Sequence, residues 1–264
     1  MRIVELSGAR VFLMENVPQL LDSDEFREIR EKAGSMGFKL WHGVLVASDY
    51  GVPQVRKRAI IVGAKDKDPS LFFPPAKTHF DPRKAKRNLK AEAQGALSPE
   101  ARPWVSVREA ISDLPPPFGT EIRDESPPLD LHFGRNPTAK SMERYRAIPD
   151  EGMNRFDLQE RALHLTPRCW IDKRSGGTDL FGRLWWDRPS FTIRTEFYKP
   201  EKGRYLHPSQ HRPITHREAA RLQTFPDDFH FTGTKIEIAR QIGNAVPPLL
   251  AAAIAQAMLP LFEI

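Results

Sequence analysis

The sequence predicts an α/β protein whose sheet-forming part is interrupted by a long, mostly irregular insert. Short apolar runs and one helical pattern alternate over residues 1–65. Residues 66–206 are rich in proline and charge, with short aromatic runs that indicate strands, and helical patterns return over residues 207–264. We therefore predict a partial α/β domain, an inserted domain and a helical return to the first domain.

The first part has the pattern strand, helix, strand, strand. The helix is expected over residues 22–36, with Asp22 or Ser23 as its N-cap and Gly37 directly after it. This order is typical of the later half of an α/β sheet with an open carboxyl edge. Three apolar runs of strand length occupy residues 11–17, 38–47 and 58–64.

The insert and the return contain fewer regular patterns. Within the insert we expect one short helix at 105–113 and strands over 181–206 with a turn at Gly203. In the return, three helices are expected. The first is capped by a Thr215–Glu218 capping box, the second covers residues 234–242 with Gly243 as its stop, and the third follows the proline pair 247–248.

The composition excludes several classes of protein. The chain has 264 residues, a net charge of +6 and one cysteine, so a disulfide framework and a thiolate metal cluster are excluded and no metal site is predicted. Its first ten residues lack the apolar core of a signal peptide, and no run of about 18 apolar residues predicts a membrane span. The expected location is the bacterial cytoplasm, at the nucleoid.

The positive charge is concentrated in the middle of the chain. Residues 135–217 carry 17 basic and 10 acidic groups, a net charge of +7, whereas residues 1–134 carry 20 and 19 and residues 218–264 carry 3 and 5. Most of these cations are arginines interleaved with aromatic residues, a combination that suits phosphate and base contacts. A solvated basic surface without a partner would give the same charge pattern.

Three short motifs carry polar groups suited to chemistry. Glu15 ends the first predicted strand, where a carboxyl kept neutral by apolar neighbours can donate a hydrogen bond to a ring nitrogen, or simply cap the strand. Alternation along an extended backbone places Gln54, Arg56 and Arg58 on one face, suited to a phosphate or carbonyl oxygen or to protecting a sheet edge. Asn244 lies in a tight turn, where its amide can cap the next helix or line a small-molecule pocket.

Five segments, taken in order, resemble the second half of the cytosine-C5 DNA methyltransferases. They are ENV, QVRKR, RPSFTIRTE, REAARLQTFPDDF and GNAVPP, and the resemblance covers about residues 10–258. It implies the C-terminal part of an S-adenosylmethionine-dependent, Rossmann-like sheet domain. Residues 1–65 would belong to the catalytic domain, 66–206 would be the inserted target-recognition domain, and 207–264 would return to the catalytic domain.

The resemblance also implies roles for individual residues. In this family a cytosine is flipped out of double-stranded DNA, a cysteine thiolate adds to C6, and the cofactor methylates C5. Glu15 would then contact or protonate N3, Arg58 would contact O2, and Arg56 would brace the pocket or a phosphate. Asn244 and Val246 would contact S-adenosylmethionine. The residues expected to contact DNA are Thr192, Arg194, Arg188, Arg174 and Lys173.

Two family features are missing from the sequence before Glu15: the Gly-rich cofactor loop and the Pro-Cys nucleophile. Cys169 lies about 150 residues later, follows Arg168, and is expected to be a partly buried small hydrophobe. We therefore expect incomplete cofactor binding and no methylation by this chain alone. It would be either a subunit completed by a separate N-terminal methyltransferase polypeptide or a truncated product. The rival interpretation is a non-catalytic, sequence-specific DNA-binding module.

Overall fold

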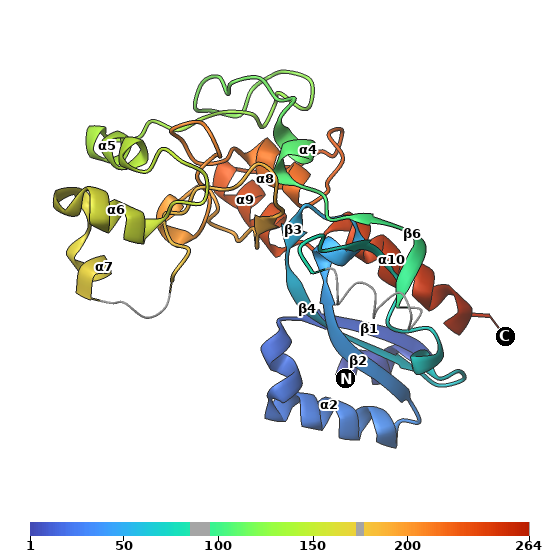
Figure 1. Ribbon diagram of the computed structural model, residues 1–264. Coiled ribbons are helices and arrows are strands. Elements are labelled where there is room, and N and C mark those ends of the chain that lie inside the picture. The colour runs from blue at the N-terminus through green and yellow to red at the C-terminus, as the bar shows by residue number, and fades with distance from the viewer. Residues whose placement is uncertain (85–95, 173–176, 264) are drawn as a thin grey trace. The chain divides into compact units, whose positions relative to one another are not determined.

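The computed structural model describes residues 1–84, 96–172 and 177–263 (Figure 1). They form two compact units. The first comprises Met1–Gly51, Val55–Trp104 and Pro248–Ile264, and the second comprises Val52–Gln54 and Val105–Pro247. Compactness is a property of packing, so the functional division at residues 65 and 206 stays a prediction.

A three-stranded antiparallel sheet forms the centre of the first unit. Its order is β1 (Val11–Asn16), β4 (Lys57–Ala64) and β2 (Lys39–Val46), with Glu15 opposite Ile60. The run 59–62 of the central strand is fully buried, as its continuous apolar sequence predicts. The three strands predicted from the sequence are thus confirmed.

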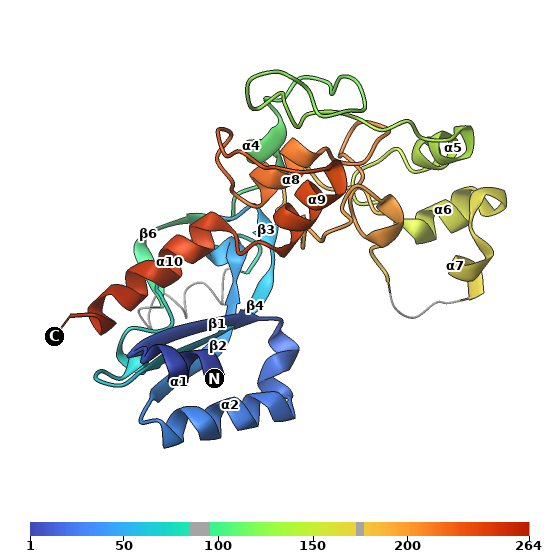
Figure 2. The ribbon, with the colours of Figure 1, turned by 180° about the vertical axis from the view of Figure 1, so that it is seen from behind.

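Helices α1 (Arg2–Ser7) and α2 (Asp24–Ser35) lie on the same face of this sheet (Figure 2). Ser23 is the N-cap of α2, because its side chain accepts a hydrogen bond from the backbone N–H of Phe26. Phe26 packs with Phe12 and other buried residues of the sheet. Helix α10 (Pro248–Met258) also belongs to this unit.

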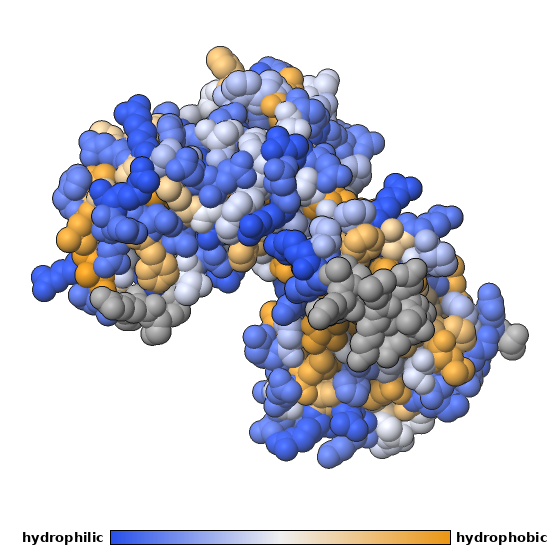
Figure 3. Space-filling view, in the orientation of Figure 1, coloured by the Kyte–Doolittle hydropathy of each residue, from blue (hydrophilic) through white to orange (hydrophobic). Residues whose placement is uncertain are grey.

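The rest of the first unit contains a strand pair that the sequence analysis did not predict. β5 (Lys77–Phe80) and β6 (Leu97–Pro103) run parallel, and a carboxylate beside them connects this pair to the unit. Asp49 accepts a hydrogen bond from Trp104 Nε1 at 3.0 Å and forms an ion pair with Lys77 at 2.6 Å. Apolar patches also reach the surface of this unit (Figure 3). Ile3, Leu6 and Leu259 are among its exposed large side chains.

The second unit is mostly irregular and carries short helices. Capping boxes begin α4 at Ser106, α8 at Thr215 and α9 at Thr234. The capping box predicted at Thr215 is thus confirmed, and helices also lie within or close to the predicted ranges 105–113 and 234–242. Three further helices in the insert were not predicted. The helices of this unit are α4 (Val107–Ile111), α5 (Ala139–Ala147), α6 (Arg155–Arg161), α7 (Arg168–Asp172), α8 (His216–Leu222) and α9 (Lys235–Asn244).

The strands expected over 181–206 are largely absent from the described residues. Among the described residues of this segment, β7 (Ser190–Phe191) is the one strand, and Leu206 forms isolated β-bridges. The aromatic and β-branched residues pack instead as an irregular core. The fully buried Arg183 donates to backbone carbonyls outside this segment. Its acceptors are the carbonyls of Tyr145, Ile148, His207 and Gln210.

One described stretch, Lys235–Leu261, is long and apolar enough by composition to resemble a membrane span. It is not a single helix, because α9 ends at Asn244 and α10 begins at Pro248. Ile238 and Ile242 of α9 are buried in the core of the second unit. The apolar composition of α9 is therefore explained by packing within the protein.

Candidate functional site

An ion pair stands at the end of the first strand. Arg58 Nε of β4 lies 2.6 Å from Glu15 Oε1 of β1, and the two side chains are 14% and 26% exposed. Glu15 faces Ile60 across the ladder, and Arg58 shares the face of Ile60 two residues along β4. The antiparallel register therefore brings together the two residues that the sequence placed in one site.

The surroundings of Glu15 differ from the expectation of apolar neighbours, because its carboxyl group contacts a guanidinium. Burial lowers the pKa of Arg58, while the charge and the hydrogen bond of Glu15 oppose that change. Arg58 also donates from Nη1 to the Lys57 carbonyl at 2.8 Å. A guanidinium has five N–H donors, so further donors remain for a ligand.

Exposure alternates in part along the QVRKR segment, and the shared face of Gln54, Arg56 and Arg58 stays a prediction. Gln54 and Arg56 are buried, at 0% and 2% exposure, whereas Lys57 between Arg56 and Arg58 is exposed. A side chain as deeply buried as that of Arg56 can brace a site from inside the protein. Its predicted contact with a flipped base or a phosphate stays a prediction.

Gln54 belongs to the second unit and connects three segments there. Its Oε1 accepts the backbone N–H of Ile193 at 2.8 Å, and its Nε2 donates to Gln223 Oε1 at 2.8 Å and to the Leu222 carbonyl at 3.2 Å. Gln223 in turn donates to the Ile242 carbonyl at 2.6 Å. The sequence analysis missed this role of Gln54 and Gln223, although both lie in recognised motifs, because their partners are distant in sequence.

The segment around Ile193 presents two predicted DNA-contacting residues. Ile193 is fully buried, Thr192 is half-buried and Arg194 is exposed, so the side chains alternate although the named strand ends at Phe191. The Tyr205 hydroxyl donates to the Thr192 carbonyl at 3.0 Å. These two bonds hold the peptide group between Thr192 and Ile193, close to the exposed Arg194.

Gly243 is inside α9, and the prediction that it stops this helix is wrong. Its position requires glycine for another reason: a Cβ there would lie 2.4 Å from the Thr195 backbone nitrogen and 2.5 Å from the Arg194 carbonyl carbon. The helix therefore approaches the recognition segment backbone to backbone. This contact links the GNAVPP motif to RPSFTIRTE within the second unit.

Arg188 and Cys169 are both exposed, whereas two other predicted residues cannot be described. Arg188 is exposed, and its Cζ lies 4.5 Å from the Trp185 ring centroid, a cation–π contact. Lys173 and Arg174 lie outside the described residues. Cys169 is exposed on α7, so the expectation that it is a partly buried hydrophobe is wrong. Its side chain is therefore not part of the core.

Asn244 and Val246, the predicted cofactor residues, follow Gly243. Asn244 is the last residue of α9 and is exposed, and Val246 is half-buried. Asn244 therefore ends α9. It does not cap the next helix, so the alternative interpretation of its amide as a helix cap is wrong. An exposed amide at a helix end suits one hydrogen bond to a cofactor such as S-adenosylmethionine. Within the described ranges, no group of three or more metal-ligating side chains is present.

Comparison with known proteins identifies the family. The model of the C-5 cytosine-specific DNA methylases matches residues 1–260. The type II methyltransferase M1.HphI of Haemophilus parahaemolyticus is 32% identical over 98% of this chain and 59% of its own length. DNA (cytosine-5)-methyltransferase 4 of Arabidopsis thaliana is 31% identical over 93% of this chain and 19% of its own. The chain thus spans about three-fifths or less of these two relatives.

A solved structure supports the fold. A candidate DNA modification methyltransferase encoded in an E. coli prophage superposes with a TM-score of 0.63 at 24% identity, over 98% of this chain and 72% of that one. This likeness confirms the predicted α/β methyltransferase fold. The family model, which matches nearly the whole chain, shows that the chain belongs to the C-5 cytosine-specific DNA methylase family.

Proposed function

We propose that this chain acts as the C-terminal portion of a DNA (cytosine-5)-methyltransferase and supplies the side chains that polarise the target base. The observation that supports this most is the ion pair between Glu15 and Arg58 on adjacent strands. Family membership makes cytosine the expected substrate. A base flipped from double-stranded DNA would meet a carboxyl group and a guanidinium held side by side.

In this proposal the two side chains divide the work. Arg58 donates a hydrogen bond to O2 of the cytosine, and Glu15 holds a proton at N3. Both contacts withdraw electrons from the ring and make C6 easier for a thiolate to attack. S-adenosylmethionine, when bound, supplies the methyl group for C5, and Asn244 and Val246 contact it. General acid assistance of this kind contributes roughly 10²–10⁴ in rate.

The nucleophile is proposed to come from outside this sequence. The only cysteine is Cys169, which lies on α7. Its flanking residues, Arg168 and Trp170, do not match the Pro-Cys motif. A partner polypeptide or a longer form of the chain would provide the thiolate and most of the cofactor pocket.

Incubation of the purified chain with labelled S-adenosylmethionine and double-stranded DNA tests the proposal. We expect no methyl transfer by the chain alone, and transfer after addition of a polypeptide that carries a Pro-Cys motif and a Gly-rich loop. A Pro-Cys motif and a Gly-rich loop encoded in any frame upstream of the Met1 codon would identify the polypeptide to add. Methyl transfer without it would contradict the assignment of the nucleophile.

A second candidate function is a non-catalytic module that binds specific DNA in the bacterial cytoplasm. The net charge of +7 over residues 135–217 and the exposed Arg188 and Arg194 favour it. With about 4–6 phosphate contacts, the logarithm of the binding constant should fall with the logarithm of salt concentration at a slope of roughly −4 to −5. Binding without salt dependence would exclude the module and weaken the assignment of this surface to DNA.

A further inference from the structure

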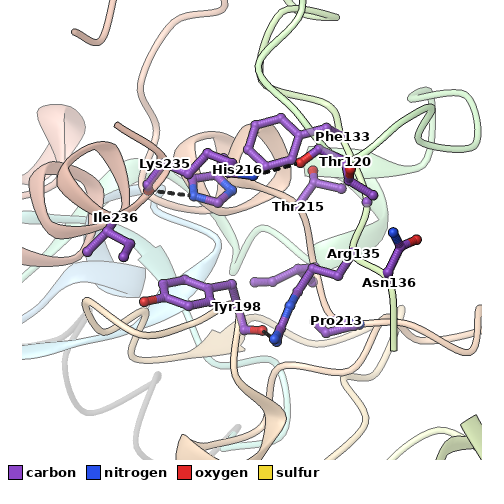
Figure 4. Close-up of a pocket in the computed structure, with 12 residues that line it drawn as sticks. Thr120, Phe133, Arg135, Asn136, Tyr198, Pro213, Thr215, His216, Lys235 and Ile236 are labelled. Carbon is purple, nitrogen blue, oxygen red and sulfur yellow. Dashed lines mark hydrogen bonds between the residues drawn. The ribbon is translucent and has the colours of Figure 1, made fainter. Parts of the chain in front are cut away.

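The second unit contains a pocket that the proposed function does not use. Its volume is about 270 Å³. This is slightly below the range of about 300–1,000 Å³ typical for drug-sized ligands, so it suits a small ligand. Neither Glu15 nor the 192–194 segment lines it. The lining includes Phe133, Arg135, Asn136, Tyr198, His216 and Lys235 (Figure 4).

Aromatic rings form the walls of this pocket. The rings of Tyr198 and His216 are stacked, with centroids 6.0 Å apart and an interplanar angle of 12°. The ring centroid of His216 lies 4.7 Å from that of Phe133 and 5.2 Å from that of the fully buried Phe197. Tyr198 as a residue is half-buried, and its ring is among the groups that line the pocket.

His216 contributes a neutral wall. Burial lowers its pKa to about 4, and its Nε2 lies 2.9 Å from the Lys235 carbonyl oxygen. A neutral imidazole has one N–H, which this carbonyl accepts. The positive charge of the pocket therefore comes from Arg135 and Lys235.

These two cations differ in their partners. Lys235 Nζ donates to Glu121 at 2.7 Å and to the Thr120 carbonyl at 3.0 Å, so its charge is already balanced. Arg135 is exposed and donates to the Tyr198 carbonyl, and no described carboxylate forms an ion pair with it. Its Cζ lies 5.8 Å from the Tyr198 ring centroid. The remaining donors of Arg135 suit a phosphate beside the aromatic wall.

We propose that this pocket binds a nucleotide, with the base against Tyr198 and the phosphate on Arg135. The exposed amide of Asn136, next in sequence to Arg135, can both donate to and accept from a base edge. The same chemistry fits a free mononucleotide and a nucleotide of DNA that has left its stack. The inference goes beyond the proposed function and does not depend on methyl transfer.

Calorimetric titration of the whole chain with adenosine 5′-monophosphate tests the inference. Saturable binding of one nucleotide per chain in the millimolar range is expected. Adenosine, which lacks the phosphate, should bind more weakly, and ribose 5-phosphate, which lacks the base, should not bind measurably. Absence of saturable binding of the monophosphate would overturn the proposal.

Variants locate the binding. Tyr198→Ala should weaken binding of the monophosphate about tenfold, since base stacking on one aromatic ring is worth about 1–3 kcal/mol, and Tyr198→Phe should bind normally. Arg135→Gln should weaken the monophosphate but not adenosine. Arg161→Gln, at an exposed arginine of the same unit, is the matched control. Normal binding of the monophosphate by both Tyr198→Ala and Arg135→Gln, with circular dichroism unchanged, would show that the nucleotide binds elsewhere.

Competition with duplex DNA identifies the source of the nucleotide. Displacement of the monophosphate by DNA would support a nucleotide of the DNA itself, and simultaneous binding would support a free nucleotide. Both results retain the pocket as the site. Because no methyl transfer is measured, failure of the proposed function leaves this test unaffected.

Discussion

At the scale of single residues, the chemistry proposed for this chain depends on Glu15 and Arg58. Both were predicted from short motifs, and their pairing follows from the antiparallel register of β1 and β4. The hydrogen bonds of Gln54 could not be predicted in this way. Its partner Gln223 is 169 residues away, so only the folded chain shows that the two side chains meet.

Substitution of the ion-pair residues should separate catalysis from binding. In the complemented enzyme, Glu15→Ala and Arg58→Ala should each slow methylation by about 10²–10⁴-fold, because the ring loses its proton or its O2 contact. Affinity for duplex DNA should change little. Single-turnover methylation and equilibrium DNA binding are the two measurements. Equal losses in both would show that these residues support DNA binding or folding and not the chemical step.

Two buried histidines should make stability depend on pH. Burial lowers the pKa of His207 and of His216 to about 4, below the 6.5 of an exposed histidine. Between these values the unfolded chain binds protons that the folded chain does not, so the free energy of unfolding should fall as pH falls from 6.5 to about 4. Each histidine contributes on the order of 3 kcal/mol over this interval.

The hydrogen bonds of His207 also predict that the free energy of unfolding falls when its ring is protonated. Its Nδ1 accepts the backbone N–H groups of Ser209 and Gln210, which a protonated ring could not do. Urea unfolding across this pH range measures the slope. His207→Gln should flatten it, whereas His230→Gln, at an exposed histidine, should not. A pH-independent free energy of unfolding would contradict the buried, neutral state of these rings.

At the scale of elements, the sequence predicts those features that depend on neighbouring residues, such as the starts of helices. Ser23, Thr215 and Thr234 begin helices because each side chain caps an orphan backbone N–H, and such caps are visible in sequence. The prediction of strands over 181–206 was wrong for most of the segment, because its buried aromatic residues pack in an irregular core. Isolated backbone bonds remain there, such as that from the Leu184 N–H to the Leu206 carbonyl, while the buried Arg183 binds the Ile148 and His207 carbonyls outside the segment.

One pair of helical glycines tests the close packing of α9 on the recognition segment. Gly243→Ala should destabilise the protein by about 1–3 kcal/mol, since its Cβ would meet the Thr195 backbone. Gly34→Ala in α2 meets no atom within 4 Å and should stabilise by roughly 0.5–1 kcal/mol. Thermal unfolding measures both. The same sign for the two changes would contradict the proposed contact.

At the scale of the whole molecule, charge and composition indicate a division of labour. The basic excess lies in residues 135–217, which belong to the second unit, while Glu15 and Arg58 belong to the first. The family could be recognised from five motifs because each marks a local requirement. The target DNA sequence could not be predicted, since side chains such as Arg194 read DNA through surface geometry that follows no code in the sequence.

The most direct test of the account compares methyl transfer by the chain alone with transfer by the chain plus a polypeptide that carries the Pro-Cys motif and the Gly-rich loop. Labelled S-adenosylmethionine and duplex DNA are the substrates, and Glu15→Ala is the matched variant. We predict no transfer by the chain alone, transfer by the mixture, and a large loss with Glu15→Ala. Transfer by the chain alone, or full activity of the Glu15→Ala mixture, would contradict the proposed role of this chain.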